Sequence, residues 1–250
     1  MKSQRSPGQQ LTGRFAVVED LQRFGLQQAI ALLHSEGCVG LFAHTQAQQE
    51  AFAAALLDAG IEAAAHCWHL YHARAADLQA QPRHLSDMPG LADTRLSVRE
   101  DWGADTTQAC RQMMQQYGVM PASEEVLRGK RVPSLLAIAR SAAADAGDGS
   151  GQILGVGSLV WGHCPEGAWR GYAHLGMVCV DGRVRGQSLG QRLVAALLLQ
   201  AVQKAGTAGI TAACAPDNPA SAKMLQACGL QCDSQRMCIL FTRDGQRRTR

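Results

Sequence analysis

The residues best placed to do chemistry form a short loop, Arg185-Gly186-Gln187-Ser188-Leu189-Gly190, between two apolar segments. Residues 174–180 have the length of a buried strand, and residues 191–204 have the apolar spacing of a helix. A loop that leaves a strand and opens a helix points several backbone N–H groups at one spot, where they and the helix dipole favour an anion. Arg185 can add a charge-assisted hydrogen bond to a phosphate. The loop therefore predicts an anion site, although a tight turn with a basic rim has the same composition.

The sequence after this loop predicts a second strand, a helix and a third strand. Residues 210–215 are a short apolar run, and Pro216-Asp217-Asn218-Pro219 can start a helix over 220–228. Gly229 stands where the glycine of a helix C-cap belongs. Residues 232–242 then return as a strand.

Together these two regions resemble the GNAT superfamily of N-acetyltransferases. The first signature of that family is Arg/Gln-x-x-Gly-x-Gly/Ala after an apolar strand, and Val180, Arg185 and Gly190 match it. The second signature is an asparagine followed eleven and twelve residues later by a Gly-apolar pair, and Asn218 and Gly229-Leu230 match it. Two signatures at the right separation are more specific than either one alone.

The resemblance implies an α+β fold with three layers and a mixed, centrally splayed sheet, preceded here by a smaller α/β segment. It also implies an N-acyltransferase that transfers the acetyl group of acetyl-CoA, its co-substrate, to an amine of a small molecule or peptide, with no metal. In the family, the strand equivalent to 172–180 holds the pantetheine arm, and one N–H polarises the thioester carbonyl. The residues that the resemblance assigns to the cofactor are Val178, Val180, Arg185, Gly186, Gln187, Ser188, Leu189, Gly190, Gln191, Asn218 and Ser221.

Two positions depart from the family pattern. Ser188 stands where the family usually has glycine, and its small side chain can be tolerated there. Leu225 stands where many members have a tyrosine that serves as general acid. The usual proton donor is therefore missing, and Cys228 and Ser221 are the nearest candidates for a substitute on the same helix.

An N-acetyltransferase must also accept a proton, because an amine is nucleophilic only when it is deprotonated. His174, six residues before Val180, is the predicted base, since the pKa of histidine suits neutral pH. A histidine that is merely packed or solvated on a strand fits the same sequence. Glu166, Glu100 and a base acting through water are the alternatives.

The acetyltransferase-like domain is predicted over 93–250. It begins with a strand at 94–100, and Asp105 or Thr106 can cap a helix that runs to about Tyr117.

The remaining segments complete the element order of the family. Residues 118–132 are predicted as a loop or short helix, which lies over the acceptor site in the resembling family. Residues 134–140 and 153–161 predict a hairpin, and residues 172–180 predict the strand that follows it.

The N-terminal part of the chain contains a weak internal repeat. Residues 37–74 align without a gap on residues 206–243, with glycines, alanines and apolar positions in register. Alanine-rich helices produce such matches by chance as well. We interpret residues 1–88 as a degenerate partial copy of the same fold followed by a linker, which we expect at 75–93.

The N-terminal copy is predicted to bind no cofactor. Residues 16–21 fall opposite the anion loop and contain no glycine, and the carboxylates of Glu19 and Asp20 would repel a pyrophosphate. Gln49 falls opposite Asn218. The copy is therefore expected to be structural or to form a wall of the acceptor site.

The segment His66-Cys67-Trp68-His69-Leu70-Tyr71-His72 could suggest a metal site. Side chains alternate along a strand, so His69 points away from the other two histidines, and the three cannot converge on a zinc ion. A histidine-rich strand without metal is the expected structure.

Composition limits the class of protein. A chain of 250 residues that is 46% hydrophobic and 18% charged suits one large or two small globular domains. The net charge of +3 does not argue for nucleic acid, and no segment has the length of a membrane span or the pattern of a signal peptide. Nine cysteines without framework spacing predict reduced thiols in a cytoplasmic protein.

Two other classes of protein stay open from the sequence. The chain could be a non-catalytic regulatory protein that binds acyl-CoA, or an interaction protein whose fold has lost the cofactor. Neither the acceptor nor the oligomeric state, a dimer included, can be read from these residues.

Overall fold

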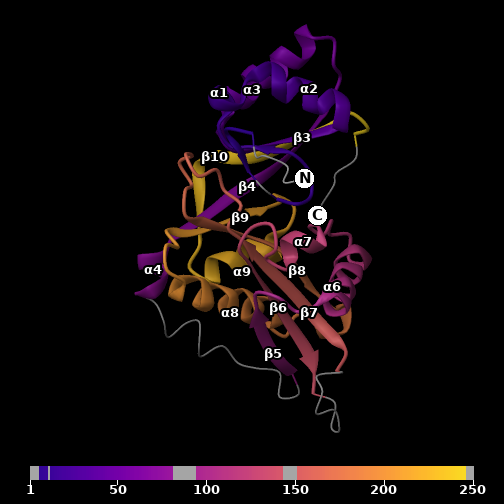
Figure 1. Ribbon diagram of the computed structural model, residues 1–250, viewed down its shortest axis with the longest axis vertical. Coiled ribbons are helices and arrows are strands. Elements are labelled where there is room, and N and C mark those ends of the chain that lie inside the picture. Colours follow the sequence, from indigo (N-terminus) through magenta and orange to yellow (C-terminus); the bar gives the residue numbers. More distant parts are fainter. Residues whose placement is uncertain (1–5, 11, 81–93, 143–150, 246–250) are drawn as a thin grey trace.

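The computed structural model describes residues 6–10, 12–80, 94–142 and 151–245. Within them, ten strands form one continuous sheet in the order β1-β2-β3-β10-β4-β9-β8-β7-β6-β5 (Figure 1). Two neighbouring pairs, β2 with β3 and β8 with β9, are parallel, and the other pairs are antiparallel. The strands are β1 (Gln9–Gln10), β2 (Val17–Val18), β3 (Cys38–Thr45), β4 (Ala64–Arg74), β5 (Thr94–Arg99), β6 (Ser134–Ser141), β7 (Ile153–Val160), β8 (Tyr172–Val180), β9 (Gly209–Cys214) and β10 (Gln231–Thr242).

Helices cover both faces of this sheet. Alternate residues of β6 enter different cores: Leu135 and Ala137 pack with α8 and α9, whereas Leu136 and Ile138 pack with α6 and α7. Because successive side chains of a strand point to opposite faces, the β5–β8 part is a three-layer structure. The helices are α1 (Leu21–Phe24), α2 (Leu26–Glu36), α3 (Gln46–Asp58), α4 (Ala75–Gln79), α6 (Ala104–Gln116), α7 (Glu124–Leu127), the 3-10 turn η1 (Gly182–Val184), α8 (Leu189–Gln203) and α9 (Pro219–Ala227).

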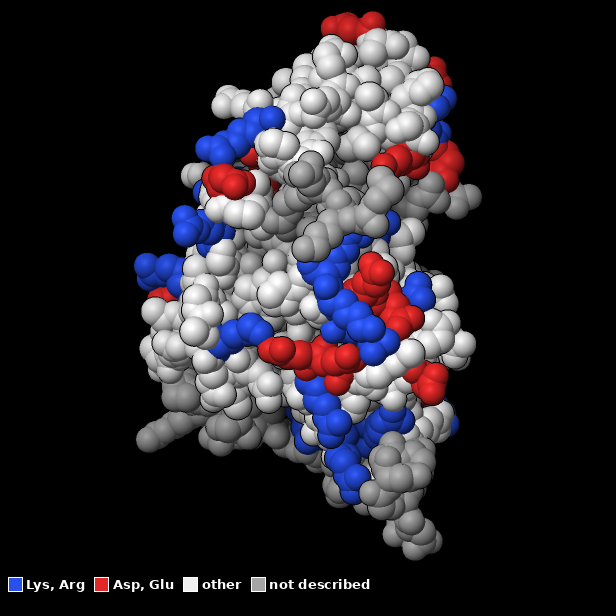
Figure 2. Space-filling view, viewed as in Figure 1, with Lys and Arg blue, Asp and Glu red and all other residues white. Residues whose placement is uncertain are grey.

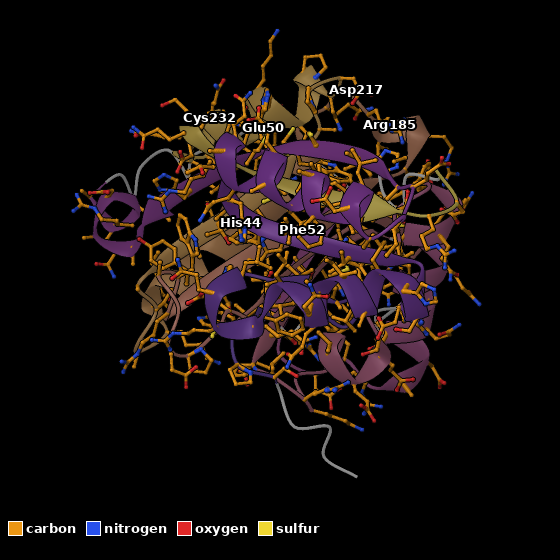
Figure 3. The ribbon with its side chains drawn as sticks, turned by 90° about the horizontal axis from the view of Figure 1, so that it is seen from above. His44, Glu50, Phe52, Arg185, Asp217 and Cys232 are labelled. Atoms are coloured by element: carbon orange, nitrogen blue, oxygen red, sulfur yellow. The ribbon has the colours of Figure 1, made fainter. Side chains whose placement is uncertain are left out.

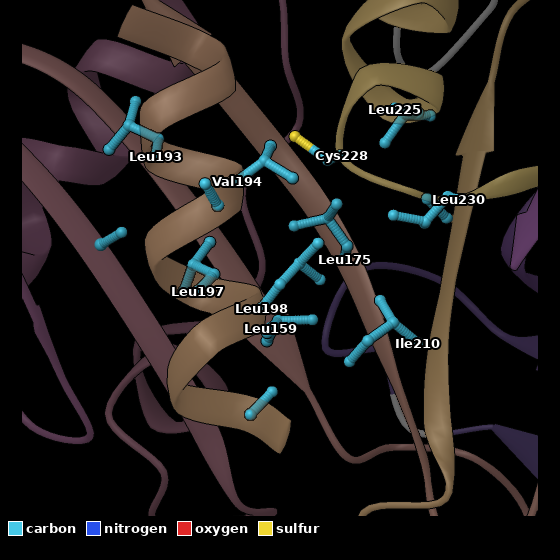
Figure 4. Packing of buried hydrophobic residues seen from close by; sticks show 14 of the residues in the cluster. Leu159, Leu175, Leu193, Val194, Leu197, Leu198, Ile210, Leu225, Cys228 and Leu230 are labelled. Atoms are coloured by element: carbon cyan, nitrogen blue, oxygen red, sulfur yellow. The ribbon is translucent and has the colours of Figure 1, made fainter. Parts of the chain in front are cut away.

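The largest core lies under α8. Its apolar positions recur with helical spacing, so that Leu193, Val194, Leu197 and Leu198 all face the sheet and are fully buried (Figure 4). They pack against strand residues that include Leu159, Leu175 and Ile210. This packing fixes the start of α8, and with it the predicted anion loop, on the end of β8.

The N-terminal helices cover the other end of the sheet. Phe52 of α3 and Leu33 of α2 enter one core with β3 and β10, and the two helices lie side by side in Figure 3. Helix α3 begins with a capping box, in which the Thr45 hydroxyl accepts from the backbone of Gln48 and the Gln48 side chain accepts from the backbone of Thr45.

The internal repeat is confirmed at the level of elements, because β3, α3 and β4 align with β9, α9 and β10. The strands of the two copies are exchanged: β10 lies between β3 and β4, and β4 lies between β10 and β9. Neither copy pairs its last strand with its own preceding strand. The two copies therefore share one sheet.

Two sequence predictions need correction. Helix α6 is capped by Gly103 and not by Asp105 or Thr106, because the Asp101 carboxylate accepts from the Gly103 N–H and starts the helix earlier. The expected linker at 75–93 begins with a helix, α4, which packs on α8 and buries Leu78. The rest of that linker, and the domain boundary predicted there, lie outside the described residues.

Surface charge is mixed in the view of Figure 2. Basic and acidic side chains alternate over the middle of this face, and the end that carries α1 to α3 shows few charges. None of the helices in the described part of the chain has the length and apolar character needed to cross a membrane.

Candidate active site

The predicted anion loop lies between β8 and α8, as expected. Gly186 and Ser188 take positive φ values of 76° and 59°. The backbone N–H groups of residues 186–190 donate no hydrogen bond to the described residues. Since α8 is 15 residues long and begins at Leu189, its dipole adds to these unpaired donors. The loop therefore presents unpaired N–H donors at the start of a helix, which is the arrangement that an anion site requires.

Arg185 is held at the edge of this loop. Its Nε donates to the Val180 carbonyl at 3.2 Å, and its guanidinium lies 5.1 Å from the centre of the Tyr117 ring. Tyr117 is itself anchored, because its hydroxyl accepts from the Gly182 N–H at 3.0 Å. The positive charge is therefore positioned before any ligand arrives.

The structure explains why two positions of the loop, 188 and 190, carry small residues. Ser188 occupies the left-handed region, which explains why a related sequence would have glycine there. Gly190 has no such torsion, but a Cβ atom at this position would lie 3.2 Å from Met224 Sδ and 3.5 Å from Val180 Cγ2. A Cβ atom at 190 would therefore require the Met224 side chain to shift by a few tenths of an ångström, whereas its contact with Val180 would be an ordinary one.

The sheet opens beside the loop. Strands β8 and β9 are paired from Tyr172 and Gly209 only as far as Leu175 and Ala212, and β8 then continues without β9. On its other side β8 has an irregularity at Met177, which takes a positive φ of 56°. The splayed strands predicted from the sequence are thus confirmed.

A cavity of 470 Å³ fills this opening and continues toward the N-terminal copy. Seven of the predicted site residues line it: His174, Val178, Val180, Arg185, Gly190, Asn218 and Ser221. The predicted residues Gly186, Gln187, Ser188, Leu189 and Gln191 lie in the loop and the first turn of α8 instead, and the Leu189 side chain belongs to the core.

Asn218 and Leu225 have clear roles within α9. The Asn218 side chain caps this helix by accepting from the Ser221 N–H at 3.0 Å, as the sequence predicted for a helix start. Leu225 is 2% exposed, lines the cavity and packs in the main core.

His174 is the last member of a buried chain of hydrogen bonds. Glu19 Oε1 lies 2.5 Å from His163 Nδ1, His163 Nε2 lies 2.9 Å from Thr211 Oγ1, and Thr211 Oγ1 lies 3.2 Å from His174 Nδ1. One proton arrangement satisfies all three contacts: His163 donates to Glu19, Thr211 donates to His163, and His174 donates to Thr211. In this arrangement His174 Nε2 keeps a free lone pair.

The surroundings of His174 keep it neutral. Burial, and then the charges of His163 and Arg14, hold its pKa well below the usual value of 6.5. The Phe42 ring lies edge-on, with its centroid 5.6 Å from that of His174. His174 Nε2 has no hydrogen-bond partner among the described residues, and His174 lines the cavity.

The other proposed acids and bases lie elsewhere. Glu100 pairs with Lys204, and Glu166 accepts a hydrogen bond from Cys164 Sγ; neither is among the residues that line the cavity. Burial raises the pKa of the Cys228 thiol to about 12, and this residue is also absent from the lining. Of the two substitutes considered for the missing tyrosine, only Ser221 faces the cavity.

Cysteine chemistry is disfavoured in the cavity. Cys179 and Cys238 line it, and burial raises the pKa of both thiols to about 12. They are therefore protonated at neutral pH and poor nucleophiles. Within the described residues, no group of three His, Cys, Asp or Glu side chains could hold a metal ion.

The sequence left open that the N-terminal copy forms a wall of the site, but it identified neither the residues that do so nor the contribution of the segment after β7. Thr12, Arg14 and Phe42 line the cavity, while Glu19 and His163 support His174 from behind. One signal was available for Glu19, because a carboxylate beside the apolar run 15–18 is unusual. No local pattern links it to His163, which lies 144 positions away.

Comparisons with known proteins agree with this geometry. The model of the acetyltransferase (GNAT) family matches residues 121–230, which contain β6 to β9 and the anion loop. A comparison with curated protein sequences gave no significant match.

Solved structures resemble the chain over nearly its whole length. A tandem GNAT protein from the clavulanic acid biosynthesis pathway has a TM-score of 0.59 and 16% identity, covering 94% of this chain and 76% of that one. A Drosophila protein has a TM-score of 0.61 and 13% identity, covering 93% and 71%. A GCN5-related N-acetyltransferase from Kribbella flavida has a TM-score of 0.55 and 13% identity, covering 93% and 79%. At these identities the likeness shows the fold.

Proposed function

We propose that this chain is an N-acetyltransferase that uses acetyl-CoA and an amine acceptor, because residues 121–230 match the model of the acetyltransferase (GNAT) family. The observation that carries the proposal is that Arg185 and Gly190 of the anion loop, His174, and residues of the N-terminal copy that include Arg14 and Phe42 line one cavity.

The first end of the cavity suits the pyrophosphate of a CoA thioester. The loop 186–190 offers N–H groups with no competing acceptor, and Arg185 adds a fixed positive charge. The exposed edge of β8 after Leu175, including Val178 and Val180, suits the pantetheine arm. A bound acetyl-CoA supplies an acyl group activated as a thioester.

The second part of the cavity suits an amine. His174 Nε2 can accept the proton that the amine loses when its nitrogen forms the new bond to the acyl carbon. The positive charge that develops on His174 is balanced through Thr211 and His163 by the Glu19 carboxylate. Of these four residues only His174 lines the cavity, and Thr211, His163 and Glu19 position its side chain.

Departure of the thiolate needs little help from the protein. A free thiol has a pKa near 8.5, so the leaving group is tolerable at neutral pH without a strong acid. Leu225 cannot donate a proton, and the hydroxyl of Ser221 is the nearest group in the cavity that can.

The state of the cysteines bears on the cellular compartment that we propose for the protein. None of the nine, all of which lie in the described part of the chain, takes part in a disulfide. We therefore propose a cytoplasmic location, where thiols stay reduced.

The test combines binding with turnover. Calorimetry with CoA should show one site per chain, and Arg185→Ala should weaken binding about 10- to 150-fold, because it removes a charge-assisted hydrogen bond worth roughly 1.5–3 kcal/mol. Turnover of acetyl-CoA with a panel of amines should occur in the parent and fall strongly in His174→Gln, whose CoA affinity should not change. Absence of CoA binding at millimolar concentration would refute the proposal.

A further inference from the structure

The N-terminal end of the cavity contains a positive charge that lacks a partner. Arg14 lines the cavity, and its Nε is buried without a hydrogen bond. Its guanidinium forms no ion pair with the described residues. It lies over the Phe15 ring instead, 5.6 Å from the ring centre. Burial lowers the pKa of Arg14 to about 10, which leaves it charged at neutral pH. An unpaired buried cation is costly unless a ligand completes it.

The segment that carries Arg14 is fixed in place. The Thr12 hydroxyl accepts from the Arg14 N–H at 3.2 Å and donates to the Phe15 carbonyl at 2.9 Å. The neighbouring carbonyl of Gly13 accepts from the Ser123 N–H at 2.8 Å, which ties the segment to the acetyltransferase half. Arg14 is therefore held in the cavity by backbone contacts on both sides.

The cavity has no negative charge to meet Arg14. Its charged lining side chains, among the described residues, are Arg14 and Arg185, and no aspartate or glutamate is present. Glu19 is the buried carboxylate nearest to Arg14 in the sequence. Its two oxygens already contact the His163 side chain and the Cys164 N–H. Such a cavity repels a polyamine and attracts an acceptor that carries an anion.

We propose that Arg14 binds a carboxylate of the acceptor, so that the substrate is an amino-carboxylate whose amine faces His174. The inference rests on the proposed acetyl transfer and names the substrate class for the same site. Guanidinium and carboxylate match in a two-bond geometry, which orients the acceptor as well as holding it. The phosphates of CoA have their own cation, Arg185, at the other end of the cavity.

The test compares acceptors that differ only in this group. We use α-, β- and γ-amino acids against their carboxamides, with acetyl-CoA as donor, in the parent, Arg14→Met, Arg14→Lys and the control Arg23→Met. Arg23 is a suitable control because it lies on α1 with a side chain 53% exposed. Taking the ratio of kcat/KM for each pair removes differences in amine reactivity.

We expect the parent to prefer the carboxylate and Arg14→Met to lose about 10- to 150-fold of kcat/KM for the carboxylate alone. Arg14→Lys should retain part of the preference, and Arg23→Met should retain all of it. An equal loss for acids and amides in Arg14→Met overturns the proposal, because it indicates a structural role. A loss seen only when succinyl-CoA replaces acetyl-CoA also overturns it, because the carboxylate then belongs to the acyl group.

A binding experiment separates this inference from the proposed function. With CoA, which cannot react, the melting temperature of the parent should rise further when the preferred amino acid is added, and that of Arg14→Met should not. The unliganded Arg14→Met protein should melt no lower than the parent. If CoA stabilises neither protein, the proposed function fails. If CoA stabilises both and no amino-carboxylate adds to it, the inference about Arg14 alone fails.

Discussion

Two corresponding strand-to-helix loops, one in each copy of the repeat, differ in what their backbone donors contact. In the loop 186–190 these N–H groups have no partner among the described residues. In the corresponding loop after β2, the Gly8 carbonyl accepts from the N–H groups of Glu19 and Asp20, at 2.8 and 3.2 Å. The Asp20 carboxylate caps α1 by accepting from the Arg23 N–H at 3.1 Å. The backbone donors of the N-terminal loop are thus satisfied by acceptors within the chain.

This difference explains why the N-terminal loop offers no free backbone donors to a ligand, although the copy still contributes to the cavity. The sequence suggested that Glu19 and Asp20 exclude a pyrophosphate by repulsion. The structure adds a more specific reason, because both carboxylates are used internally and Glu19 reaches across to His163. The N-terminal copy therefore supports His174, the base that we propose, through His163 and Thr211, and it also lines the cavity.

The largest effect should come from removing the N-terminal copy. Deleting residues 1–88 takes away β3 and β4, which are the two neighbours of β10, and also exposes the edge of β9. We expect the remaining fragment to aggregate, with loss of near-ultraviolet circular dichroism. A monomeric, fully active fragment of residues 89–250 would show that the exchanged strands are dispensable.

The two carboxylates of the N-terminal loop should differ in their importance. Glu19→Ala leaves the buried His163 side chain without its partner and should lower the free energy of unfolding by about 3–5 kcal/mol. Asp20→Ala removes a partly exposed helix cap and should cost about 0.5–2 kcal/mol. Urea unfolding of both variants measures the difference. Equal losses would mean that the Glu19–His163 contact contributes no more than a cap.

Equivalent leucines in the two copies allow a matched comparison. Leu225 of α9 and Leu56 of α3 are each 2% exposed, and each replacement by alanine should cost about 2–5 kcal/mol. Only Leu225 lines the cavity, so only Leu225→Ala should alter the KM for acetyl-CoA. Neither variant should change the pH profile of turnover, because leucine does not titrate. A lost basic limb in Leu225→Ala would contradict our alignment of α9.

The pH dependence of activity should report His174. Its pKa is lowered in the folded protein, so the neutral base persists below pH 6.5, and turnover should fall only on further acidification. The stability of the folded protein should change with pH in the same direction as the activity. The unfolded chain binds this proton more readily, so the free energy of unfolding decreases as the pH falls below 6.5.

The surroundings of His174 supply the control for this measurement. Burial is the main cause of its lowered pKa, and the positive charge of Arg14 also contributes. Its hydrogen-bond partner is Thr211, with His163 and Glu19 behind. Arg14→Met should therefore move the acid limb of kcat/KM to higher pH. A limb that stays in place in both Arg14→Met and His174→Gln belongs to another group.

The smallest effect concerns Ser188. Its left-handed torsion costs a non-glycine residue about 1–2 kcal/mol, so Ser188→Gly should raise the free energy of unfolding by roughly 1 kcal/mol. Asp20→Gly in the other loop should lower it, because Asp20 has an extended backbone and acts as a cap. Thermal unfolding of the pair checks both signs. A destabilised Ser188→Gly protein would indicate that the serine hydroxyl is needed.

The elements that sequence could predict are those governed by local physics. The strand at Tyr172–Val180 has the predicted bounds, and Asn218 caps α9 where the breaker cluster indicated a helix start. Periodicity and caps are properties of neighbouring residues, so a single sequence contains them. The same local logic placed the start of α6 two residues late, because Asp101 acts from outside the helix.

The remaining features depend on distant residues. The partner of Glu19 is in the segment after β7, and the exchange of β4 and β10 depends on which of several apolar strands pair. Arg14 lies in a segment with no regular structure of its own, and the role that we propose for it depends on a folded cavity whose lining, among the described residues, contains no aspartate or glutamate. No spacing rule within the sequence encodes these contacts.

The position of β10 has a consequence for the order in which the chain can fold during synthesis. Residues 231–242 are synthesised long after β3 and β4, yet they form the strand between them. Until they emerge, the N-terminal strands have open edges that can pair with other chains. The sheet can therefore close only after β10 has emerged from the ribosome, and a nascent chain that still lacks this strand should depend on chaperones that shield strand edges.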